Sequence, residues 1–114
     1  MRPLKKLQAR FYETPTARKP VREWLLDLEA GDRRTIGYDI QTVEFGWPVG
    51  MPTCRPLGDG LWEVRSDLRG GSIGRVIFCI AKGEMVLLHG FIKKTQKTPQ
   101  RDVDLANQRR KEIE

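Results

Sequence analysis

The chain has 114 residues, of which 39% are hydrophobic and 32% are charged, and its formal net charge at pH 7 is +6. This length leaves room for one core, so we expect residues 1–114 to form a single domain, and the apolar content excludes a disordered chain. The positive charge favours a polyanionic partner, most commonly nucleic acid, although charge by itself also serves solubility.

The first half of the chain predicts a strand followed by two helices. Apolar and polar residues alternate over residues 4–13, which is the pattern of a strand. Pro20 suits the first position of a helix, apolar residues follow it at helical spacing, and Gly31 is expected to end that helix. Asp32 is expected to cap a second helix that ends near Gly46, so the two helices form an antiparallel hairpin.

The second half predicts three strands and a final helix. Residues 47–60 are rich in Pro and Gly and are expected to be loop. Period-two patterns predict strands over 60–68, 74–81 and 85–93, with a tight hairpin at Lys82-Gly83-Glu84. The last of these strands is apolar on both faces, as a central strand would be. Residues 100–114 predict a charged helix with a thin apolar contact.

The order of these elements predicts an α+β fold. It comprises an N-terminal strand, the helical hairpin, a three-stranded antiparallel meander and a C-terminal helix. The expected arrangement is a mostly antiparallel sheet with the helices packed on one face.

Metal sites, disulfide scaffolds and membrane spans are not expected. Cys54 and Cys79 match no metal-ligand spacing, and with a single His and no clustered carboxylates a protein-built metal site is not predicted. No cofactor is expected either. No apolar run approaches the length of a membrane span, and the N-terminus lacks a signal-peptide pattern, which predicts a soluble, cytoplasmic protein without a membrane partner.

Two arginines are expected to share one face of the sheet. Alternation places Arg65 opposite the side of Trp62, and Arg75 opposite the side of Val76, so both point away from the aromatic side that the helical hairpin covers. A guanidinium stays protonated near neutrality and binds phosphate oxygens two at a time. The alternative is that these arginines pair with Glu63 and Asp67 across strands.

A cationic segment follows the last predicted strand. Lys93, Lys94 and Lys97 lie within five residues, with no acidic neighbour before Asp102, and Phe91 precedes them. A run of charge is usually a solvated face. Here it joins a strand beside two arginine-bearing strands, and cations combined with a ring that stacks on a base are typical of single-stranded RNA recognition.

Three segments of the sequence resemble a known family. "LWEVR" at 61–65, "GRVIFCI" at 74–80 and above all "LLHGFIKKTQKTP" at 87–99 are similar to RelE/ParE-type toxins, in the phage-derived, HigB-like branch. The resemblance spans nearly the whole chain. It implies a RelE-type fold, a toxin of a type II toxin-antitoxin system that acts as a ribosome-dependent mRNA endonuclease, and a cognate antitoxin, expected to be a small helix-turn-helix DNA-binding protein.

The resemblance also implies roles for the cationic residues. Cleavage requires a deprotonated 2′-OH, a stabilised phosphorane and a protonated leaving group, and in RelE-like enzymes Arg and Lys largely replace histidines in this task. Arg65 matches the family's strand arginine and is assigned to the scissile phosphate, and Arg75 to a further phosphate contact. Lys93, Lys94 and Lys97 are candidates for backbone contacts or acid/base work. A lysine base needs a lowered pKa, which neighbouring cations favour.

Other candidates have alternative interpretations. His89 is the only imidazole and a candidate RNA contact, but its apolar strand favours a hydrogen-bonded core residue. Arg55 either approaches the RNA or is a solvated loop cation. Unlike some members of the family, the chain has no Tyr after its last strand, and Phe91 does not exchange a proton. Two other functions therefore stay open: a gyrase-targeting, ParE-like toxin, and a non-catalytic phage-derived protein that binds RNA or a host factor.

Overall fold

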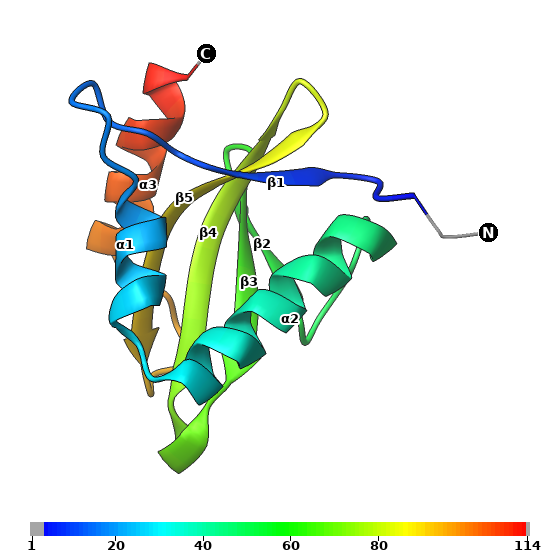
Figure 1. The fold of residues 1–114 in the computed structure, drawn as a ribbon, viewed down its shortest axis with the longest axis vertical. Coiled ribbons are helices and arrows are strands. Elements are labelled where there is room, and N and C mark those ends of the chain that lie inside the picture. The colour runs from blue at the N-terminus through cyan, green and yellow to red at the C-terminus, as the bar shows by residue number, and fades with distance from the viewer. Residues whose placement is uncertain (1–3, 114) are drawn as a thin grey trace.

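The computed structural model describes residues 4–113, and within them the chain forms three α-helices and a five-stranded mixed sheet in the strand order β1-β5-β4-β3-β2 (Figure 1). The elements are β1 (Gln8–Phe11), α1 (Pro20–Asp27), α2 (Ala30–Gly46), β2 (Cys54–Gly58), β3 (Leu61–Asp67), β4 (Ile73–Ala81), β5 (Glu84–Lys93) and α3 (Gln100–Glu112). The predicted α+β class is confirmed. None of the helices in residues 4–113 has both the length and the apolar character needed to cross a membrane.

The sheet is antiparallel from β2 to β5 and parallel where β1 pairs with β5. Lys82 and Gly83 both have positive φ and join β4 to β5 as the predicted tight hairpin. β5 lies between β1 and β4, and its residues from Met85 to Leu88 are at most 2% exposed. The prediction that this strand is central is therefore confirmed.

The segment predicted to be loop contains one more strand of the meander. β2 pairs with β3, from Cys54 opposite Val64 to Gly58 opposite Leu61. Pro56 argued for a loop, but β2 is the edge strand, where the N–H that proline lacks is not needed for the ladder. The predicted three-stranded meander is thus wrong, because the meander has four strands.

The break between the two N-terminal helices lies earlier than predicted. Leu28, just after α1, is extended, and Gly31 lies inside α2. Nη1 of Arg33 donates to the carbonyls of Leu26 and Leu28, at 3.4 and 3.2 Å. A side chain of α2 thereby satisfies carbonyl groups at the end of α1. Asp32 lies in the first turn of α2, so the cap predicted at this residue is wrong.

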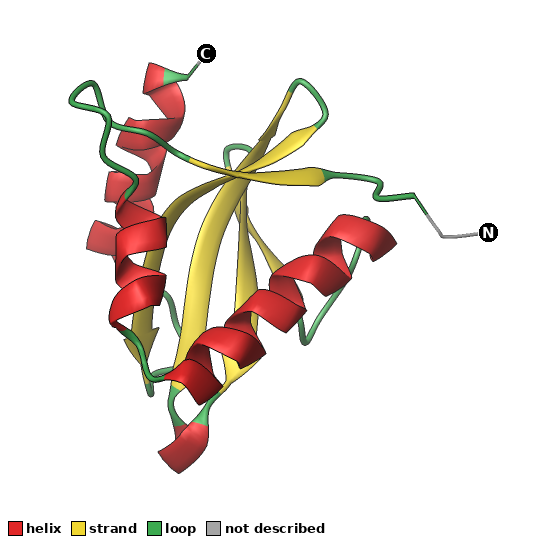
Figure 2. Cartoon of the chain, viewed as in Figure 1, coloured by secondary structure: helices red, strands yellow, loops and turns green. Residues whose placement is uncertain are grey.

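The helices cover both faces of the sheet, whereas packing on one face was predicted (Figure 2). α1 and α2 bury one face, with Val21, Leu25, Ile36, Ile40 and Val43 against Val64, Val76 and Phe78. α3 covers the opposite face, where Ala106, Val103 and Ile113 meet Ile77, Cys79 and Leu88. The second face needs its own cover because β4 and β5 carry apolar side chains on both sides. The thin apolar contact predicted for the last helix is confirmed.

Candidate functional site

Arg65 and Arg75 lie directly opposite each other on neighbouring strands. The register of β3 and β4 pairs Arg65 with Arg75, and that of β4 and β5 pairs Arg75 with Phe91. Residues that face each other across antiparallel strands project to the same side of the sheet. The prediction that the two arginines share a face is therefore confirmed, and this face is opposite to the one under α1 and α2.

A buried carboxylate balances the two arginines. Glu63 is 0% exposed, and its Oε1 accepts a hydrogen bond from Nη1 of Arg65 at 3.0 Å. The Thr98 hydroxyl donates to the other carboxylate oxygen of Glu63 and accepts from Nη1 of Arg75 at 3.3 Å. The expected alternative of arginine–carboxylate pairing thus holds for Arg65, although its partner lies on the same strand. Without Glu63, Arg65 would lose its carboxylate partner, and burying the charge of the arginines would be strongly unfavourable.

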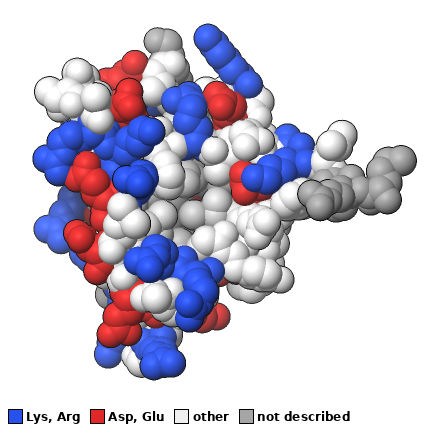
Figure 3. Space-filling model, viewed as in Figure 1, with Lys and Arg blue, Asp and Glu red and all other residues white. Residues whose placement is uncertain are grey.

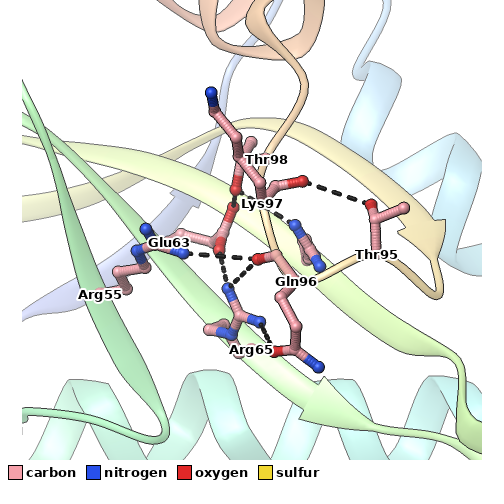
Figure 4. A network of polar contacts seen from close by, with 8 residues as sticks. Arg55, Glu63, Arg65, Thr95, Gln96, Lys97 and Thr98 are labelled. Carbon is pink, nitrogen blue, oxygen red and sulfur yellow. Dashed lines mark hydrogen bonds and ion pairs between the residues drawn. The ribbon is translucent and has the colours of Figure 1, made fainter.

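The residues after β5 fold over the arginines. We call residues 94–98 the lysine loop. The backbone carbonyl of Gln96 accepts from Nη1 of Arg65 at 3.2 Å and from Nη1 of Arg55 at 3.4 Å, and the Gln96 side-chain oxygen accepts from Nη2 of Arg65 at 3.2 Å (Figure 4). Thr95 donates to the carbonyl of Lys97, while the Lys97 ammonium points away from this network. The loop therefore joins Arg55, which the sequence placed in a separate segment, to the site.

The loop leaves the predicted cations with different access to solvent. Arg75 is 0% exposed and the Arg65 side chain is 9% exposed, while Lys94 and Lys97 are exposed. Lys93 and Arg55 are half-buried. Within residues 4–113, Nε and Nη2 of Arg75 have no hydrogen-bond partner. Burial lowers the pKa of the Arg75 guanidinium, and the Glu63 carboxylate opposes that change.

His89 lies on the same face and pairs with α3. Its Nε2 is 2.7 Å from Oδ1 of Asp102, and its ring stacks on Phe91 with centroids 5.4 Å apart. Burial lowers the pKa of His89, and Asp102 opposes this change. The geometry agrees with the interpretation of His89 as a hydrogen-bonded core residue. Phe91 is 8% exposed and also lies 5.9 Å from the Arg75 guanidinium carbon, so its ring is enclosed by these neighbours.

Four residues that organise the site were not predicted as members of it. Thr98 and Gln96 lie within the segment that carried the family resemblance, but their contacts with the arginines depend on how the loop folds back. Asp102 is separated from His89 by the whole lysine loop. Among these residues only Glu63 could be found from a local sequence pattern, because strand alternation places it on the same face as Arg65.

On the face covered by α1 and α2, positive and negative side chains are mixed. In Figure 3, which shows that face, Lys and Arg side chains are interspersed with Asp and Glu, and no uninterrupted positive patch is visible. The exposed lysines of the lysine loop belong to the opposite face, because the loop contacts Arg65 and Arg75 there. The arrangement presents two exposed ammonium groups, those of Lys94 and Lys97, above two enclosed guanidinium groups.

Within residues 4–113, no group of three or more His, Cys, Asp or Glu side chains is arranged to hold a metal ion.

Comparison with known proteins supports one family. No curated protein matches the sequence. The family model described as phage derived protein Gp49-like (DUF891) matches residues 23–111, which include α2, β2 to β5, the lysine loop and most of α1 and α3. The chain therefore belongs to the Gp49-like family of phage-derived proteins.

Proposed function

We propose that this protein is the toxin of a type II toxin-antitoxin system, and that it inhibits translation by cutting mRNA on the ribosome without a metal ion. The observation that carries the proposal is the pair Arg65 and Arg75, in direct register beneath a loop that carries Lys94 and Lys97. Membership of the Gp49-like family, which is associated with RelE-type toxins, supports it, as does the resemblance of residues 87–99 to the HigB-like branch.

The proposed reaction is transesterification within the RNA. The 2′-oxygen bonds to the adjacent phosphorus as the bond from phosphorus to the 5′-oxygen breaks, which leaves a 2′,3′-cyclic phosphate and a 5′-hydroxyl. One proton leaves the 2′-OH and one joins the 5′-oxygen, and we assign these transfers to Lys93 and Lys94. Arg65 holds the scissile phosphate, and its planar fork suits the charge that builds on the phosphorane.

Substrate binding must rearrange the lysine loop. Within residues 4–113, two of the three side-chain hydrogen bonds of Arg65 go to neutral oxygens of Gln96. A phosphate is the stronger partner, because its oxygens carry negative charge and accept two parallel hydrogen bonds from a guanidinium. Arg75 reaches a phosphate only when Thr98 moves, and its free Nε and Nη2 donors are then available. We expect RNA to displace the loop from both arginines.

The remaining candidates are assigned to RNA contacts outside the cleaved bond. Lys97 is exposed beside the site, and Arg55 shares the Gln96 carbonyl with Arg65. Phe91 and His89 stack on each other on the face of the arginines, and we assign them as stacking partners for a base. The proposed partners are mRNA on the ribosome and a cognate antitoxin of the helix-turn-helix type.

One observation favours a second candidate function. The near-complete burial of Arg75 and Arg65 in an ion-pair network is what a purely structural role would also produce. In that case the exposed lysines would bind a target without cutting it, as in a gyrase-targeting toxin or a phage-derived protein that binds RNA or a host factor.

Expression of the protein followed by primer-extension mapping of transcripts distinguishes these functions. We expect cut mRNA, and we expect Arg65→Ala and Lys94→Ala each to reduce cleavage about a hundredfold, since each removes a transition-state contact. Arg65→Lys keeps the charge that Glu63 needs and tests the guanidinium alone. Arg22→Ala, exposed on α1 on the opposite face, is the matched control. Growth arrest with intact mRNA and blocked replication would contradict the proposal.

A further inference from the structure

A pocket of about 420 Å³ opens beside Arg65, at the end of the sheet where β3 loses its edge partner. Pairing with β2 ends at Cys54, opposite Val64, so the next residues of β3 border the loop that precedes β2. The N–H of Arg65 donates to the carbonyl of Thr53 at 2.8 Å, which fixes that loop against the strand. Thr35 and Asp39 of α2 line the other wall.

The lining combines hydrogen-bonding groups with apolar surfaces. The polar side chains are those of Thr35, Asp39, Thr53, Arg65, Asp67 and Gln96, and the apolar ones are those of Met51, Pro52 and Ile73. A volume of this size lies in the range of small-ligand sites, which typically pair apolar walls with a few convergent polar groups. The pocket is therefore suited to a flat, neutral ring with polar edges.

We infer that this pocket binds the base of a nucleotide whose phosphate is held by Arg65, and that it selects guanine. This inference rests on the proposed function. Arg65 contributes to the pocket wall and to the arginine pair, so one side chain joins the base site to the phosphate site. The sequence alone did not indicate this pocket, because its walls come from α2, the loop before β2, strands β3 and β4, and the lysine loop.

The charges in the pocket favour a neutral occupant. The carboxylates of Asp39 and Asp67 repel a phosphate from the interior, and Arg65 on the wall weakens their attraction for a guanidinium or ammonium group. A neutral base that donates hydrogen bonds satisfies the carboxylates. Guanine donates from N1 and N2 in parallel, so both oxygens of one carboxylate are paired. Adenine and cytosine place an acceptor beside their amino group, and uracil places two carbonyls beside its single donor.

Binding of the four nucleoside 5′-monophosphates, measured by calorimetry, tests the inference. We expect the wild-type chain to bind GMP at least about tenfold more tightly than AMP, CMP or UMP, as one bidentate pair allows. The double variant Asp39→Asn/Asp67→Asn should lose most of that preference. Asp59→Asn, at an exposed turn outside the pocket, should keep it. In NMR spectra of the wild type, GMP should shift the amide signals of Thr53 and Ile73.

The outcomes separate this inference from the nuclease proposal. Selective GMP binding that the double variant loses supports the pocket even if no RNA is cut, and then only the nuclease proposal fails. Cleaved RNA with equal binding of the four nucleotides, or with GMP shifts elsewhere in the chain, overturns the pocket and leaves the nuclease proposal intact. Tighter binding of N-acetyl-arginine amide than of GMP also overturns it, because the pocket would then suit a basic peptide.

Discussion

At the scale of residues, the site is defined by how its charges are compensated. Arg65 and Arg75 would repel each other across the strands, and Glu63 is the carboxylate between them. The Thr98 hydroxyl bridges Glu63 and Arg75, so the loop is held by the same network that it covers. In a low-dielectric environment such a network is stable only when its members are paired. The arginines are thus held in position, and their access to a ligand depends on the position of the lysine loop.

The role of Glu63 predicts a large loss of stability when it is removed. We expect Glu63→Ala to lower the free energy of unfolding by about 3–5 kcal/mol, the usual result of deleting one partner of a buried ion pair. The measurement is urea denaturation followed by circular dichroism. Asp67→Ala is the matched control on the same strand and face, and because Asp67 is exposed we expect a change within about 0.5 kcal/mol. Equal effects of the two substitutions would contradict the assigned role.

His89 predicts a dependence of stability on pH. Burial lowers its pKa below 6.5, against the opposing effect of Asp102 and with the help of Arg109. Below pH 6.5 the unfolded chain therefore binds a proton that the folded chain does not, and stability falls as the pH falls. We expect the free energy of unfolding to drop more between pH 7 and 5 in the wild type than in His89→Gln. The chain has one His, so parallel profiles of unfolding free energy against pH in the two proteins would show that His89 does not cause the pH dependence.

At the scale of elements, alternation and register bring the site together. The antiparallel pairing of β3, β4 and β5 sets Arg65, Arg75 and Phe91 in one row, and the neighbouring row ends at His89. The opposite side of β5 is fixed by α1, where Trp24 packs on Gly90. The packing of α1 therefore positions the strand that leads into the lysine loop.

The contact between Trp24 and Gly90 predicts opposite effects for two glycine substitutions. A Cβ at Gly90 would lie 2.4 Å from Cε3 of Trp24, so we expect Gly90→Ala to destabilise the fold by about 1–3 kcal/mol. A Cβ at Gly37, inside α2, would have nothing within 4 Å, so Gly37→Ala should stabilise it by about 0.5–1 kcal/mol. Urea denaturation of both variants is the test, and a neutral Gly90→Ala would show that the ring has room to shift.

At the scale of the whole molecule, the two faces of the sheet have different tasks. α1 and α2 cover one face with a surface of mixed charge (Figure 3), and the other face carries α3 and, beneath the lysine loop, the two arginines. The net charge of +6 alone would attract any polyanion. The position of Lys94 and Lys97 directs that attraction toward the candidate site.

This asymmetry predicts how RNA binding depends on salt. Each phosphate contact with single-stranded RNA contributes about 0.7 to the slope of log affinity against log salt concentration. Lys94→Ala/Lys97→Ala should therefore reduce the slope by roughly 1.4. Lys19→Ala/Arg22→Ala removes the same charge at exposed positions on the side of α1 and should leave the slope nearly unchanged. Fluorescence anisotropy with a labelled single-stranded RNA gives the slope for each protein. Equal reductions of the slope in the two double variants would indicate nonspecific attraction.

The residue pattern by itself determined the fold class, the central position of β5 and the shared face of Arg65 and Arg75, because helical and strand periodicities are local properties of the chain. It did not determine β2, whose proline is acceptable only at a sheet edge, or the position of α3, which follows from the need to cover a second apolar face.

The tertiary structure alone decided how accessible the cations are. The family resemblance assigned Arg65 and Arg75 to phosphate contacts, with pairing to acidic residues of the sheet as the alternative, and it made the lysines candidates for backbone contacts or acid/base work. In the folded chain, Gln96 and Thr98 return from beyond β5 to cover the arginines. Among the cations predicted for the site, only Lys94 and Lys97 are exposed. Contacts between residues some thirty positions apart depend on how strands pair and where a loop folds back, and no local pattern encodes either.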